Sequence, residues 1–239
     1  MSIWGKLAGA AAGFALGGPI GALLGGLAGH FGLDRTAGHD AAQDRAVAFT
    51  VGVIALGAKM AKADGIVTSD EVQAFKEVFR VPPGEMRNVA HIFDLAKQDV
   101  AGYEAYAEQL AEMFRDNRRL LEDVLEGLFH IAAADGVLHP KEDEFLAAVA
   151  DRFGFSTAEF RAVRARFIPA DKTDPYLVLG VARTATLEAV KLRYRKLLQE
   201  NHPDKAMARG MPAEFIKIAT DKAAAINAAY EQVLAERGG

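Results

Sequence analysis

The segment VKLRYRKLLQENHPDK, residues 190–205, predicts a helix that ends in a sharp polar turn. Its apolar residues recur at three- and four-residue intervals, as on the buried face of an amphipathic helix. These apolar residues are Val190, Tyr194, Leu197 and Leu198. The basic residues Lys191, Arg193, Arg195 and Lys196 occupy the rest of the helix and predict a cationic surface. The triplet His202-Pro203-Asp204 ends the pattern, because proline lacks a backbone donor and disfavours helix at the residue before it.

Shorter patterns frame this basic helix on both sides. Asp174 and Pro175 predict a short helix that Gly180 ends, because aspartate caps helices, proline suits the first position and glycine suits the end. Thr186 then caps the start of the basic helix. After the turn, a third apolar pattern again has helical spacing. We therefore expect residues 174–239 to form a helical hairpin with the His-Pro-Asp loop exposed at its tip.

This arrangement resembles the J domain, the module by which a co-chaperone engages a DnaK-type chaperone ATPase. The segments that carry the resemblance are DPYLVLGV at 174–181, the basic helix, the triplet at 202–204 and INAAYE at 226–231. The resemblance implies that the partner is a DnaK-type chaperone whose ATP hydrolysis the chain stimulates. The DnaK-binding residues that it implies are His202, Pro203, Asp204, Lys191, Tyr194, Arg195 and Lys196.

The chemistry of the tip agrees with a transient polar contact. Pro203 fixes one backbone angle and stiffens the turn, and the carboxylate of Asp204 suits a bidentate hydrogen bond from an arginine. A basic helix steers encounter with an acidic surface and raises the association rate more than the affinity. Taken separately, a charge run is more often a solvated face, and the triplet is more often an ordinary turn. Their combination at J-domain spacing favours partner binding.

Residues 1–35 predict a transmembrane anchor. No charged residue occurs from Leu7 to Gly29, and a helix of that length covers about 33 Å, enough for a hydrocarbon core of about 30 Å. We expect Pro19 to kink this helix near its middle. The alternatives are a flexible Gly/Ala-rich leader and a cleavable signal peptide, although no clear cleavage site closes the apolar run.

Glycine recurs at every fourth position of this segment, from Gly5 to Gly29. In a membrane helix, small residues at this spacing let two helices approach closely. We therefore expect a homodimer through the membrane helix. The glycines expected at its interface are Gly9, Gly13, Gly17, Gly21 and Gly25.

Residues 36–168 have helical patterns throughout and contain an internal repeat. The sequence ADGIVTSDE at 63–71 matches ADGVLHPKE at 134–142. Each copy predicts a helix, a tight Asp-Gly turn and a second helix, with the glycine in the left-handed conformation. The repeat resembles the TerB-type helical domain. Residues 169–173 are left as a short linker to the J-like module.

Helix caps account for most of the polar residues in and after the repeat. Thr68 with Glu71, and Ser156 with Glu159, predict capping boxes. Pro140 fits the first helical position after His139. The acidic residues Asp64, Glu71, Asp135 and Glu142 would be the candidates for a metal site. We assign them to turns and caps, because an EF-hand type of site needs several oxygen ligands within about twelve residues.

Composition excludes several classes of site. The chain has no cysteine, which excludes disulfides and cysteine-based zinc sites. A net charge of −4 gives no reason to expect nucleic acid, and no aromatic platform accompanies the basic helix. No nucleophile–base pair or phosphate-binding loop is recognisable. We expect no cofactor, no metal and no catalytic activity of its own.

The order of the parts is an all-α chain with an N-terminal transmembrane helix, a TerB-like helical bundle and a C-terminal J-domain hairpin. This order resembles the DjlA family of membrane-anchored, DnaJ-like co-chaperones. The resemblance implies a single-pass protein of the bacterial inner membrane with its C-terminal domains in the cytoplasm. The alternative is a membrane scaffold or stress sensor that acts through the acidic TerB-like domain, with the J domain as recruiter.

Overall fold

The computed structural model describes an all-helical chain. It describes residues 17–31, 41–64, 69–79, 86–98, 102–167, 174–208, 211 and 216–238. In these residues every regular element is a helix and none is a strand, which confirms the predicted fold class. The helices are α3 (Gly18–Phe31), α4 (Ala41–Asp64), α5 (Ser69–Phe79), α6 (Met86–Gln98), α7 (Tyr103–Met113), α8 (Arg118–Ala132), α9 (Pro140–Arg152), α10 (Thr157–Arg164), α11 (Pro175–Leu179), α12 (Leu187–Glu200), α13 (Pro203–Ala208) and α14 (Ile216–Glu236).

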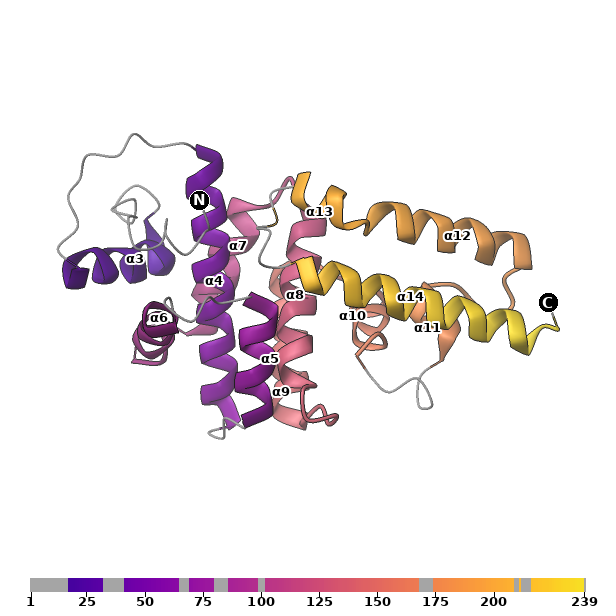
Figure 1. The fold of residues 1–239 in the computed structure, drawn as a ribbon, viewed down its shortest axis with the longest axis horizontal. Coiled ribbons are helices and arrows are strands. Elements are labelled where there is room, and N and C mark those ends of the chain that lie inside the picture. Colours follow the sequence, from indigo (N-terminus) through magenta and orange to yellow (C-terminus); the bar gives the residue numbers. More distant parts are fainter. Residues whose placement is uncertain are drawn as a thin grey trace.

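A bundle of helices α4 to α10 forms the middle domain (Figure 1). The long helix α4 contacts α6, α7, α8 and α9 and supplies much of the core. Helix α8 is buried along most of its length. Its Phe129 packs between two other rings, with ring centroids 5.6 Å from Phe160 and 5.4 Å from Phe167. These ring contacts pack the C-terminal end of the middle domain against α8.

The turns of the second repeat copy follow the sequence prediction. Gly136 has φ +82°, the left-handed conformation expected after a helix. Pro140 occupies the first turn of α9, and Glu142 accepts a hydrogen bond from the backbone N–H of His139 at 3.0 Å. Ser156 and Glu159 form the expected capping box of α10. In the first copy, the predicted box of Thr68 and Glu71 lies outside the residues and side chains that the structure describes.

The N-terminal segment differs from one continuous helix. Helix α3 begins at Gly18, and both Gly17 and Gly18 have positive φ, +60° and +61°. Pro19 therefore lies in the first turn of α3, where proline is tolerated, and not at a kink in mid-helix. Gly9 and Gly13 lie outside the described residues. Where the structure describes the chain, no helix has both the length and the apolar character that crossing a bilayer requires.

Helix α3 packs on the middle domain. Ile20, Leu23 and Leu24 are buried in its core, and α3 contacts α7 and α4. The side chain of Gln109 caps the start of α3, because its Oε1 accepts from the N–H of Ile20 and its Nε2 donates to the carbonyl of Gly17, each at 2.9 Å. The described part of the glycine-rich segment is therefore held against α7.

The C-terminal module is a hairpin of α12 and α14 closed at one end by the short α11 (Figure 1). Asp174 caps α11 by accepting from the N–H of Tyr176 at 3.0 Å, and Gly180 ends it with φ +65°. Thr186 caps α12 by accepting from the N–H of Ala189 at 3.2 Å. These caps were predicted. The buried residues of this module's own core are Tyr176, Val178, Leu179, Val190, Leu197, Ile226, Ala229 and Val233.

A cluster of buried charges joins the C-terminal module to α8. The ammonium of Lys222, on α14, lies 3.1 Å from a carboxylate oxygen of Glu122 and 2.9 Å from one of Glu126. Arg166 donates to the same two carboxylates. Arg119 bonds Glu122 at 2.7 Å. Opposite charges therefore neutralise one another where the surroundings exclude water.

This cluster holds Glu122 in its ionised form. Burial raises the pKa of Glu122, but the charges of Lys222, Arg166 and Arg119 outweigh burial and set that pKa well below its ordinary value of 4.5. A carboxylate whose pKa is lower in the folded than in the unfolded chain stabilises the fold at pH values above its unfolded pKa. That stabilisation is lost as the pH falls toward the folded pKa.

We therefore predict that the free energy of unfolding falls as the pH is lowered below about 4.5, the ordinary value for this carboxyl. Urea unfolding between pH 7 and pH 3 measures this decline. Glu122→Gln should reduce the slope of the free energy of unfolding against pH, because the variant has no carboxyl at that position to protonate. Glu144→Gln, at an exposed position on α9, should leave the slope unchanged. Equal slopes in the wild type and Glu122→Gln would contradict the assignment.

Candidate functional site

The His-Pro-Asp triplet lies at the start of α13, at the tip of the hairpin. The side chains of His202 and Asp204 are 60% and 80% exposed. The carbonyl of His202 accepts from the N–H groups of Lys205 and Ala206, at 2.9 and 3.1 Å. Pro203 is the first residue of α13, where its missing N–H removes no bond. The exposed tip is confirmed, but the triplet begins a helical turn and does not form an open loop.

Local hydrogen bonds orient the side chain at the centre of the tip. The backbone N–H of Asp204 donates to Nδ1 of His202 at 3.2 Å, which orients the imidazole ring against the turn. The carboxylate of Asp204 lies 3.6 Å from the same nitrogen. With Nδ1 engaged in the turn, the opposite edge of the imidazole is the one offered to a partner. The tip thus presents a ring nitrogen and a carboxylate on a stiff backbone.

The residue before the tip is an internal support. Asn201 is 1% exposed, and its side-chain amide donates to the carbonyl of Leu197 at 2.7 Å. The same carbonyl also accepts from the backbone N–H of Asn201 at 2.9 Å, so Asn201 holds the last turn of α12 through both its backbone and its side chain. Asn201 is therefore the residue at which α12 ends, directly before the exposed His202. Sequence analysis did not predict this role.

Helix α12 carries an exposed basic face next to the tip. Lys191, Arg195 and Lys196 are exposed, and the ion pair of Lys196 with Glu200 is long, at 3.9 Å. Arg193 differs from the prediction that all four basic residues share this surface. It is half-buried and its Nε donates to the carbonyl of Leu179 at 3.1 Å, which joins α12 to α11. Burial, together with nearby arginines, lowers its pKa.

Tyr194 lies between α12 and α14 and is only partly open to solvent. Its ring stacks on that of Tyr230, with centroids 4.0 Å apart and an angle of 8°. Its hydroxyl donates to the side-chain oxygen of Asn227 at 2.9 Å. The structure therefore gives Tyr194 a clear part in holding the hairpin together. Its predicted contact with a partner remains a prediction.

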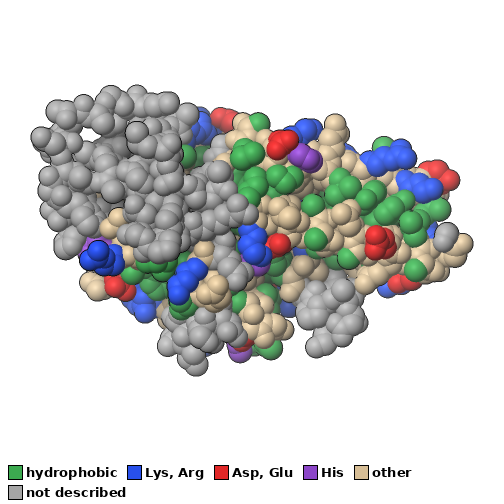
Figure 2. Space-filling view, in the orientation of Figure 1, with side chains coloured by type: hydrophobic (Ala, Val, Ile, Leu, Met, Phe, Trp, Pro, Cys, Tyr) green, Lys and Arg blue, Asp and Glu red, His purple; other side chains and the backbone are tan. Residues whose placement is uncertain are grey.

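Two exposed apolar side chains close in sequence to the basic residues and the tip were not predicted. Leu192, within the basic helix, is 70% exposed, and Met207, after the tip, is 43% exposed. Figure 2 shows Lys and Arg side chains beside hydrophobic ones over the end of the molecule that α12 and α14 form. In the sequence, the exposure of Leu192 could have been inferred because this leucine lies outside the apolar positions of the helix. Such a mixed surface suits a partner that contributes acidic and apolar groups.

Three family models match the chain. The model described as the co-chaperone DjlA transmembrane domain matches residues 1–46. The model for the tellurite resistance protein TerB matches residues 50–165, and the DnaJ domain model matches residues 174–236. The tip and the basic face therefore lie in a DnaJ domain, hereafter the J domain, and the middle domain is of the TerB type. No solved structure matches the chain.

Curated relatives cover most of the chain. The co-chaperone protein DjlA of Photobacterium profundum is 33% identical over 236 residues, which span 88% of this chain and 84% of that protein. The chain belongs to the DjlA family of co-chaperones. DjlA proteins of Vibrio vulnificus and Vibrio cholerae are 32% and 31% identical, each over 75% of this chain. As a DjlA-family member with a matching transmembrane domain, the chain is a membrane-associated J-domain co-chaperone.

Proposed function

We propose that this chain stimulates ATP hydrolysis by a DnaK-type chaperone through the tip and the basic face of α12. The observation that supports the proposal most strongly is that the tip and the basic residues of the preceding helix are all exposed. His202 and Asp204 offer polar groups on a rigid turn, and Lys191, Arg195 and Lys196 lie along α12, which leads directly into that turn. Such a small polar surface suits a short-lived complex. The chain then acts as an activator of another protein's ATPase.

The same proposal includes a location. A match to a transmembrane domain over residues 1–46 supports an anchor at the bacterial inner membrane. ATP and DnaK-type chaperones are found in the cytoplasm, so the TerB-like and J domains face that side of a single-pass protein. The glycines at every fourth position, from Gly9 to Gly25, support self-association of the anchor. Insertion of α3 into the membrane requires it to leave its place in the core of the TerB-like domain. Carbonate extraction tests the anchor, because release of the full chain into the soluble fraction would exclude integral insertion.

Charge reversal on α12 tests the docking surface. We expect the triple variant Lys191→Glu, Arg195→Glu and Lys196→Glu to raise the concentration for half-maximal stimulation of DnaK by about tenfold or more, since these charges steer association. The measurement is a titration of DnaK with the full chain in lipid nanodiscs, at low and at physiological salt. High salt should reduce the difference between the wild type and the variant.

A matched control separates a local effect from net charge. The variant Arg115→Glu, Lys141→Glu and Arg161→Glu changes the net charge equally, at exposed positions of the TerB-like domain. It should leave the titration within about twofold of the wild type, because charges far from an interface are screened. Equal weakening by both triple variants would show that α12 is not the docking surface.

A further inference from the structure

Helix α14 belongs to two cores. Its C-terminal half supplies Ile226, Ala229 and Val233 to the core of the J domain. Its N-terminal half supplies Ile218 and Ala219 to the core of the TerB-like domain. A helix of a self-contained hairpin would bury its apolar side within the hairpin alone. The first two turns of α14 are instead part of a contact between domains.

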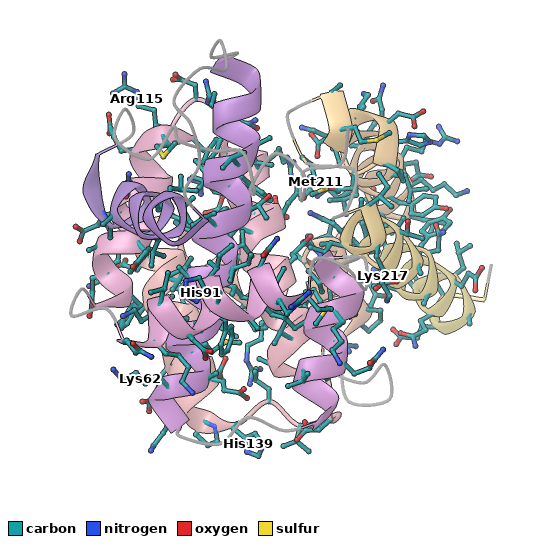
Figure 3. The ribbon with its side chains drawn as sticks, turned by 60° about the vertical axis from the view of Figure 1, so that its left-hand side comes forward. Lys62, His91, Arg115, His139, Met211 and Lys217 are labelled. Atoms are coloured by element: carbon teal, nitrogen blue, oxygen red, sulfur yellow. The ribbon has the colours of Figure 1, made fainter. Side chains whose placement is uncertain are left out.

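The segment around the tip makes the same contact. Ala206, on α13, is 0% exposed and Met211 is 3% exposed, and both belong to the core of the TerB-like domain. Figure 3 shows Met211 between the bundle and the helices of the J domain. The inner side of the tip is therefore covered, while His202 and Asp204 on its outer side stay exposed.

Lys222 provides the ionic part of this contact. Its side chain is 1% exposed, and the acidic groups within 4.0 Å of its ammonium, among the described residues, lie on α8 of the other domain, at Glu122, Asp123 and Glu126. A buried ammonium without counter-charges is costly. Because the three carboxylates all belong to the TerB-like domain, Lys222 is neutralised only when the two domains are in contact. Arg119 and Glu200 add a second bridge, at 2.5 Å, between α8 and α12.

Close packing at one glycine completes the contact. A Cβ at Gly127 would lie 2.9 Å from Cδ1 of Ile218, so the end of the Ile218 side chain would have to move to make room for it. Glycine at this position of α8 therefore allows α14 to lie directly against it. Glycine inside a helix costs up to about 1 kcal/mol relative to alanine, so close approach is a physical reason for its presence.

From these contacts we propose that the TerB-like domain is a dock for the J domain. The dock holds the first two turns of α14 through Lys222 and Gly127, and it leaves the tip and α12 as the J-domain surface offered to a partner. The reading of that surface as the DnaK-binding side rests on the proposed function; the docking itself does not. The J domain is thus presented in one orientation and does not swing freely on its linker.

Distance measurement between the two domains tests the dock without any chaperone. The chain has no cysteine, so spin labels can be attached at two introduced cysteines, Glu144→Cys on α9 and Gln199→Cys on α12, both at exposed positions. Double electron–electron resonance on the full chain in nanodiscs then reports the distribution of distances. Docking predicts one narrow distribution. A broad distribution in the otherwise wild-type chain would overturn the proposal.

Charge variants at the dock test the ionic contact of Lys222. Lys222→Glu places a fourth carboxylate among three, and should broaden the distribution. Adding Glu126→Lys restores an ion pair with the charges exchanged, and should narrow it again. Lys205→Glu makes the same charge change at an exposed position of α13 and should change nothing. A distribution that stays narrow in Lys222→Glu would overturn the role of the ionic contact.

The packing contact is tested separately. Gly127→Leu should broaden the distribution, because its side chain would occupy the space of Ile218. Adding Ile218→Ala makes room and should narrow the distribution again. Circular dichroism distinguishes undocking from unfolding, since the J-domain core residues Tyr176, Leu197 and Ile226 are unchanged in all of these variants. A narrow distribution in Gly127→Leu alone would overturn the packing argument.

Hydrogen exchange links the dock to the proposed function. The amides of residues 216–222 should be protected in the free chain already and should gain little protection when DnaK and ATP are added. New protection should appear on α12 and around the tip. If residues 216–222 lose protection when DnaK protects α12, the dock opens on binding and the proposal is wrong. If DnaK changes no protection anywhere, the proposed function fails while the distances still test the dock.

Discussion

Asp204→Asn is expected to abolish most of the stimulation of DnaK while the fold is unchanged. Losing a charge-assisted hydrogen bond costs about 1.5–3 kcal/mol, so the half-maximal concentration should rise by about tenfold to a hundredfold. The side chain of Asp204 is 80% exposed, so its replacement removes no buried contact. Asparagine has nearly the same shape and keeps one acceptor oxygen, but it cannot offer two equivalent oxygens to an arginine.

Two measurements check this prediction together. Single-turnover ATP hydrolysis reports stimulation, and thermal unfolding should show a stability within about 0.5 kcal/mol of the wild type, as for other surface changes. Asp151→Asn, at an exposed position of α9, is the matched control and should stimulate like the wild type. Full stimulation by Asp204→Asn would remove this carboxylate from the proposed contact.

Leu197→Ala is expected to have the largest effect on stability. Leu197 is 0% exposed and belongs to the J-domain core, which also contains Val190, Ile226 and Val233. Removing a buried leucine side chain typically costs about 2–5 kcal/mol, from lost burial and from the cavity left behind. Because α14 also enters the core of the TerB-like domain, part of this loss should appear in the cooperative unfolding of both domains.

The same helix provides the control. Leu192 is 70% exposed, so Leu192→Ala should change the free energy of unfolding by less than about 0.5 kcal/mol. Urea unfolding followed by circular dichroism compares the two variants. Equal losses of stability would contradict the assignment of Leu197 to the core and Leu192 to the surface. In a DnaK titration, Leu192→Ala should stimulate less well than the wild type although its stability is unchanged, because the variant loses an exposed apolar contact.

Local signals in the sequence predicted much of this fold. The caps at Asp174, Thr186 and Ser156 follow from side chains that satisfy the free N–H groups of a helix start. Gly136 and Gly180 take the left-handed conformation that the repeat and the short helix required. These features depend on a few neighbouring residues, so a single sequence is enough to find them.

Contacts between distant segments were not predictable in the same way. Arg193 was assigned to the basic surface, because its position alone does not reveal the carbonyl of Leu179 fourteen residues earlier. Lys222 was not singled out, since its carboxylate partners lie 100 residues away, at Glu122 and nearby on α8. The triplet was expected as a loop, although proline and aspartate after His202 are also the residues that begin a helix.

The central claim is that this DjlA-family chain activates a DnaK-type ATPase. Its most direct test is single-turnover hydrolysis of ATP by DnaK, with and without the full wild-type chain in nanodiscs. The account predicts acceleration by about tenfold or more, equivalent to lowering the barrier by at least about 1.4 kcal/mol. An unchanged rate at concentrations well above those of DnaK would contradict it.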